Sequence, residues 1–111
     1  MKERPTGQQI LQVLADELPY LRQRFGVKRI ALYGSYARGT ASPRSDVDVL
    51  VELERPLGLQ FVALAQYLED RLGLRVDLLM ASDLRRNRTA PRYRHIAADI
   101  ERNLIYVQPS S

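Results

Sequence analysis

The chain has 111 residues, a formal net charge of +4, 45% hydrophobic residues and 27% charged residues, which is the size and composition of one globular domain. With no cysteine and one histidine, it lacks the means for a disulfide scaffold, a thiolate zinc site or a cysteine nucleophile, so a metal would need oxygen ligands. No apolar run approaches the ~20 residues of a membrane-spanning helix, and the first residues lack the apolar core of a signal peptide. We therefore expect a cytoplasmic protein with a single domain over residues 1–111.

The first half of the chain predicts a helix followed by two strands. Apolar residues recur at helical spacing from residue 10 onward, Pro19 should kink or restart that helix, and Gly26 should end it. Residues 29–33 and the valine-rich residues 46–52 both have the pattern of a strand. A loop is expected between these two strands.

The second half predicts a helix, a strand and a last helix. Residues 57–72 place apolar side chains on one helical face, residues 75–80 form a short apolar run, and residues 93–104 again show helical spacing. The predicted order is α-β-β-α-β-α. This order indicates an α/β or α+β fold in which helices flank one small mixed sheet.

Three aspartates on predicted strands form a candidate metal site. Asp46 and Asp48 are two residues apart, so on a strand they point to the same side. Like charges at close range are costly unless a cation lies between them, and carboxylate oxygens favour Mg²⁺ or Mn²⁺. If the strand of Asp77 pairs beside that of Asp48, three carboxylates meet and can hold two ions. Asp77 would then bind the ion on the acceptor side and assist deprotonation of an attacking hydroxyl.

The segment that follows the first strand is a candidate phosphate site. Gly34 and Ser35 form a turn that is expected to open a short helix, whose free N–H groups can hold phosphates. Arg38, one helical turn later, can bring its charge to the same phosphate, and Gly39 permits a sharp exit. A glycine turn or a pair of aspartates alone also fits a solvated loop or strand face. Their joint occurrence favours a site.

These motifs resemble a known family. Gly34-Ser35-x-x-Arg38-Gly39, then Ser45-Asp46-x-Asp48 and a later Asp77, is similar to the DNA polymerase beta-like nucleotidyltransferase superfamily. The short chain looks most like its minimal nucleotidyltransferases, the MntA-type antitoxins of HEPN/MNT toxin–antitoxin pairs. The resemblance implies the polymerase beta-like nucleotidyltransferase fold, and it covers about residues 30–77.

The resemblance also implies an activity and assigns roles to residues. Asp46, Asp48 and Asp77 would be catalytic and would hold Mg²⁺, with two ions expected. The nucleotide would be bound by Gly34, Ser35, Arg38, Gly39 and Ser45. ATP would be the donor, and AMP would pass to a tyrosine hydroxyl of a partner HEPN ribonuclease toxin and silence it. This donor and this acceptor follow from the resemblance alone.

Two other functions remain open at this stage. The chain could be an antitoxin that neutralises its partner by binding without catalysis, or a nucleotidyltransferase that acts on a small molecule. The arginines between residues 85 and 94 could dock an acidic partner, a triphosphate or RNA, or could form a solvated face. Because the positive excess is modest, we expect no dedicated nucleic-acid surface and no membrane partner.

Overall fold

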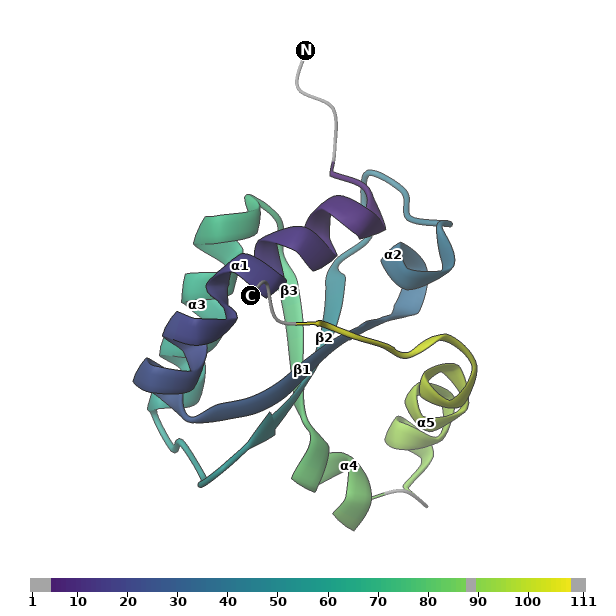
Figure 1. Cartoon of the computed structure of the whole chain (residues 1–111). Coiled ribbons are helices and arrows are strands. Elements are labelled where there is room, and N and C mark those ends of the chain that lie inside the picture. Colours follow the sequence, from purple (N-terminus) through teal and green to yellow (C-terminus); the bar gives the residue numbers. More distant parts are fainter. Residues whose placement is uncertain (1–4, 88–89, 109–111) are drawn as a thin grey trace.

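The computed structural model describes residues 5–87 and 90–108, and its centre is a mixed sheet (Figure 1). Along the sheet the strands follow the order β3-β2-β1-β4, in which β1 is antiparallel to both β2 and β4, and β2 is parallel to β3. The strands are β1 (Val27–Tyr33), β2 (Val47–Leu53), β3 (Val76–Met80) and β4 (Ile105–Tyr106). The predicted small mixed sheet flanked by helices is confirmed.

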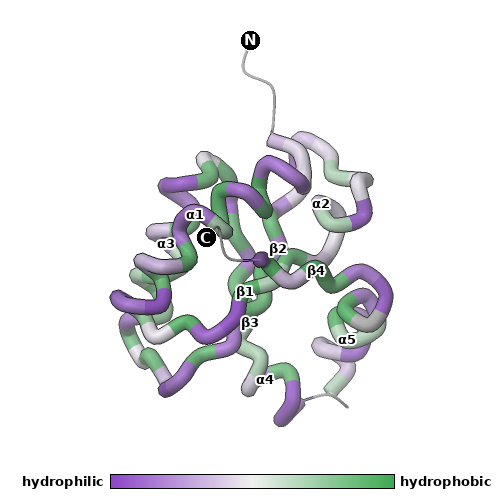
Figure 2. Tube along the Cα trace, in the orientation of Figure 1, coloured by the Kyte–Doolittle hydropathy of each residue, from purple (hydrophilic) through white to green (hydrophobic). Residues whose placement is uncertain are grey.

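Two long helices cover one face of the sheet. They are α1 (Gly7–Phe25) and α3 (Gln60–Leu72), and both alternate between hydrophilic and hydrophobic segments as expected for helices with one buried side (Figure 2). Their buried residues pack against the inward-facing valines of β2. The largest fully buried side chains of this core include Ile10, Leu14, Leu18, Leu21, Leu64, Leu68, Val47, Val49 and Val51.

The first helix has well-defined ends and passes through its proline. Thr6 and Gln9 form a reciprocal capping box at the N-terminus, and Gly26 ends the helix in the left-handed conformation, with φ of 69°. The helix does not restart at Pro19, which lies on its exposed side. None of the described helices is long and apolar enough to cross a membrane.

The other face of the sheet is covered by two C-terminal helices. They are α4 (Ala81–Arg86) and α5 (Pro91–Asn103), which pack on a smaller cluster of Ala31, Tyr33, Leu50 and Leu79. The short helix α2 (Gly34–Arg38) follows β1 directly and lies beside α5 (Figure 1). The sequence pattern predicted neither α4 nor β4 as separate elements.

Candidate active site

Two of the three predicted aspartates lie side by side on adjacent strands. Asp48 of β2 and Asp77 of β3 are register partners in the parallel pair, and Tyr33 of β1 is the partner of Asp48 on its other side. Register partners point to the same face of a sheet, which here is the face covered by α4 and α5. Asp48 is partly buried and Asp77 is exposed. The expectation that the strand of Asp77 pairs beside that of Asp48 is confirmed.

Asp46 stands at the edge of this pair. It precedes β2, which begins at Val47 and not at residue 46 as predicted, and its side chain is exposed. Its charge still acts on Asp48, because it contributes to the raised pKa of that carboxyl group. Over residues 5–87 and 90–108, no three histidine, aspartate or glutamate side chains are grouped closely enough to hold a metal ion. The structure thus brings Asp48 and Asp77 together, with Asp46 near them.

The electrostatics around Asp48 favour a cation. Burial, followed by the charges of Asp77, Asp46 and Asp99, raises the pKa of Asp48 from 3.8 to about 6, while Arg38 opposes this rise. Burial, followed by the charges of Asp48, Asp77 and Asp99, also raises the pKa of Tyr33 above its usual value. Because carboxylate oxygens are the ligands that Mg²⁺ prefers, Asp48 and Asp77 are the residues here that could hold a magnesium ion.

Gly34 is required by the closeness of its backbone to Asp48. A Cβ atom at this position would lie 2.0 Å from Asp48 Oδ2, and φ is +75°, a conformation that side chains rarely adopt. The first residue of α2 therefore lies in close contact with the Asp48 carboxylate. The Gly34 turn and Asp48, which belong to the two predicted motifs, therefore lie close together.

Asp99 of α5 contacts this turn, and it was not identified as a site residue from the sequence. Its Oδ2 accepts a hydrogen bond of 2.8 Å from the Gly34 N–H, and its Oδ1 pairs with the guanidinium of Arg38 and accepts a bond of 2.9 Å from Asn103 Nδ2. A usable signal exists in the sequence. Asp99 lies three residues after Ile96 and one before Ile100, so it interrupts the apolar face of the last helix.

The remaining predicted nucleotide ligands shape the backbone around the turn. The Ser35 carbonyl accepts the N–H groups of Gly39 and Thr40, and Gly39 ends α2 with φ of 79°, which is the sharp exit predicted for it. Ser45 belongs to the following loop, where its Oγ accepts the Ser42 N–H at 2.9 Å. Direct contact of Ser35, Gly39 and Ser45 with a nucleotide stays a prediction.

Comparisons with known proteins identify the family. The family model described as "Nucleotidyltransferase domain" matches residues 17–107. The chain belongs to the nucleotidyltransferase domain family. It is 44% identical, over 92% of its length and 96% of the relative, to the protein adenylyltransferase MntA of Thermococcus cleftensis. The resemblance seen in the sequence is confirmed, and the chain is a nucleotidyltransferase.

Two solved structures share the fold of this nucleotidyltransferase. One is a toxin–antitoxin complex with AMP-PNP, with a TM-score of 0.62 and 23% identity over 91% of this chain and 74% of that chain. The other is a tri-AMPylated HEPN toxin from Shewanella oneidensis in complex with an MNT antitoxin, with a TM-score of 0.58 and 20% identity over 95% of this chain and 74% of that chain. At these identities the likeness concerns the fold.

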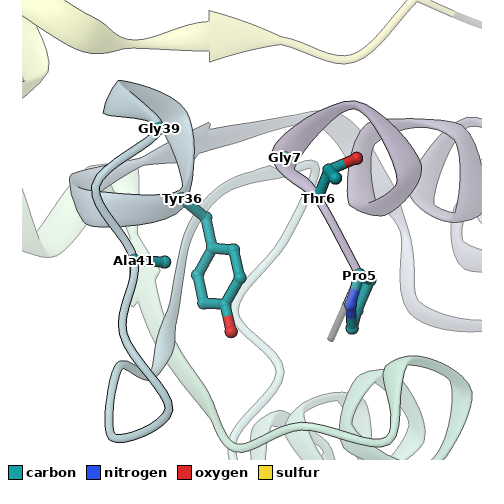
Figure 3. A pocket seen from close by; sticks show the side chains of 6 residues that line it. All are labelled: Pro5, Thr6, Gly7, Tyr36, Gly39 and Ala41. Carbon is teal, nitrogen blue, oxygen red and sulfur yellow. The ribbon is translucent and has the colours of Figure 1, made fainter. Parts of the chain in front are cut away.

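Tyr36 of α2 packs in the core on the face of the sheet that α1 and α3 cover. The residue is 95% buried, and it lines a cavity of about 250 Å³ between α2 and the start of α1 (Figure 3). The hydroxyl has no hydrogen-bond partner among the described residues. Tyr36 thus packs in the core of the nucleotidyltransferase.

The basic stretch of residues 85–94 is partly described. Arg85, Arg86 and Arg94 are exposed, and Arg86 pairs with Asp83 at 2.6 Å within α4. Arg88 and the side chain of Arg92 lie outside the described part of the chain. These exposed side chains fit the solvated face that was one of the sequence-based interpretations.

Asp48 should make the nucleotidyltransferase less stable as the pH rises. Its pKa is about 6 in the folded protein and ~3.9 in an unfolded chain, so protonation favours the folded state. This stabilisation is fully present below about pH 4 and is lost as the pH rises through 6. After allowance for solvent screening, Asp48→Asn should be more stable than the unaltered protein by about 1 kcal/mol at pH 8, and by almost nothing at pH 4.

Urea unfolding at several pH values measures this effect. Asp70→Asn, which removes an exposed charge on α3, is the control and should show no comparable trend. Saturating Mg²⁺ at pH 8 should stabilise the unaltered protein and not Asp48→Asn. A difference between Asp48→Asn and the unaltered protein that stays constant from pH 4 to 8 would contradict the assigned electrostatics.

Proposed function

We propose that this nucleotidyltransferase is an antitoxin that transfers AMP from ATP to a tyrosine hydroxyl of a partner HEPN-type ribonuclease toxin, in a Mg²⁺-dependent reaction. The observation that carries the proposal is the register pairing of Asp48 with Asp77 directly beside the Gly34 turn. The 44% identity to a protein adenylyltransferase supports a protein acceptor. The proposal takes residues 1–111 as one minimal domain that works in the cytoplasm.

In this proposal, the start of α2 binds the triphosphate. The N–H groups of Gly34 and Ser35 and the guanidinium of Arg38 donate to phosphate oxygens, and the positive end of the helix favours their charge. Asp48 and Asp77, with Asp46 beside them, would hold the magnesium ions. When bound, Mg²⁺ neutralises charge on the phosphates and lowers the pKa of the attacking hydroxyl.

The acceptor would enter on the side of Asp77. Asp77 is the more exposed of the paired aspartates, so a hydroxyl from a second protein can approach it. The tyrosine oxygen forms a bond to the α-phosphorus while the bond to pyrophosphate breaks. The phenol proton passes to the Asp77 carboxylate, and pyrophosphate leaves with the electron pair of the broken P–O bond. Positioning and charge neutralisation supply most of the catalysis.

A pyrophosphate-release assay with the purified chain, ATP and a purified HEPN-type partner tests this proposal. We expect pyrophosphate only when partner and Mg²⁺ are both present, and none after EDTA treatment. Asp70→Asn should retain the unaltered rate. Neutralisation of the toxin without pyrophosphate release would favour an antitoxin that acts by binding, and release with small hydroxyl compounds in place of the partner would favour a small-molecule transferase.

A further inference from the structure

Asp99 occupies the donors that the proposed function assigns to a nucleotide phosphate. Its two carboxylate oxygens accept from the Gly34 N–H at 2.8 Å and from the guanidinium of Arg38. We propose that Asp99 is an internal competitor, an anion that fills the phosphate position of the resting site and that ATP must displace. This inference rests on the proposed function and adds a residue that sets the affinity for nucleotide.

A carboxylate and a phosphate compete directly for these donors. Both are anions that accept hydrogen bonds from a backbone N–H and a guanidinium, and the single Gly34 N–H points at one acceptor at a time. The Asp99 side chain is 19% exposed and that of Arg38 is 42% exposed, so solvent and a phosphate can reach the pair. The contact between Asp99 and Arg38 thus lies at the margin of the site, where a phosphate can replace Asp99.

The helix that carries Asp99 keeps the carboxylate in place. Asn103, one turn later on α5, donates to Asp99 Oδ1 at 2.9 Å. Apolar residues of the same helix, Ile96 and Ile100, pack on the cluster around Tyr33 and Leu50. Displacement of Asp99 by a phosphate therefore requires rotation of its side chain or a shift of α5. Either movement breaks the contact between Asp99 and Arg38.

An alternative role makes the opposite prediction. If Asp99 orients Arg38 for the phosphate, its removal weakens nucleotide binding. If Asp99 competes with the phosphate, its removal strengthens binding. The direction of the change in affinity separates the two roles.

Isothermal titration of the purified chain with three probes measures this direction. ATP, inorganic tripolyphosphate and adenosine are titrated into the unaltered chain, Asp99→Asn and Asp99→Ala. Loss of a charge-assisted competitor should strengthen the binding of ATP and of tripolyphosphate by about tenfold. Adenosine, which carries no phosphate, should bind all three proteins equally. Asn103→Ala, which leaves the carboxylate in place but less firmly held, should show a smaller gain in the same direction.

The controls distinguish failure of this inference from failure of the proposed function. Asp70→Asn should bind as the unaltered chain does, which excludes a general effect of net charge. If the unaltered chain binds ATP and the Asp99 variants bind it equally or more weakly, the competitor role is wrong and the proposed function stands. If none of these proteins binds ATP, the proposed function fails, and the inference fails with it.

Discussion

Replacement of Asp48 by asparagine should lower the rate of AMP transfer by about a hundredfold to a thousandfold while the fold stays intact. Asp48 lies between the Gly34 turn and Asp77, so it is next to both the proposed triphosphate and the proposed magnesium ions. Asparagine has the same shape but lacks the charge that would hold a cation. Because the cost of burying the Asp48 charge and its repulsion by neighbouring carboxylates both disappear, the loss of activity should accompany a gain in stability above pH 6.

Single-turnover transfer to the partner, measured beside urea unfolding, tests this combination. Asp77→Asn should also lower the rate strongly. Asp70→Asn on the other face of the sheet should leave it unchanged. An Asp48→Asn protein that transfers AMP at a near-normal rate would show that the metal assignment is wrong, and one that is inactive because it has unfolded would contradict the structural account.

Replacement of Gly34 by alanine should destabilise the protein by about 3 kcal/mol and abolish nucleotide binding. Two costs add at this position. The positive φ of 75° disfavours any side chain, and the new Cβ would meet Asp48 Oδ2 at 2.0 Å. Asp48 would have to move away from the turn, which would separate the proposed phosphate and metal sites.

Gly73 provides a matched control for the first of these costs. It ends α3 with φ of +67°, and a Cβ there has no neighbour within 4 Å among the described residues. Gly73→Ala should therefore cost only about 1 kcal/mol and leave ATP affinity unchanged. Urea unfolding and ATP titration of both variants measure the difference. Equal destabilisation by the two substitutions would mean that the contact between Gly34 and Asp48 is looser than the structure indicates.

The elements with strong periodicity could be predicted from the sequence. The three main strands and three long helices were found because each has apolar residues at a regular spacing. Some boundaries were misplaced, since β1 begins at Val27 and not at the predicted residue 29. β4 could not be predicted from the sequence, because two residues are too few to show a periodic pattern. This strand is defined by its pairing with β1. Helix α4 is short and has no buried residue, so it lacks the same signal.

The candidate site was predictable where one strand sets the geometry. Alternation along a strand placed Asp48 on the face opposite Val47 and Val49, and the parallel partner placed Asp77 next to it. Contacts between distant segments were not predictable. The bond from Gly34 to Asp99 joins residues 65 positions apart, and nothing local to α2 indicates that α5 covers it.

The intact mass of the HEPN-type partner, co-expressed with this chain or with its Asp48→Asn variant, tests the central claim most directly. We expect the partner to gain the mass of one or more AMP units with the unaltered chain, and to keep its unmodified mass with the variant. A partner that co-purifies and is silenced without any gain in mass would contradict AMP transfer as the mechanism of neutralisation.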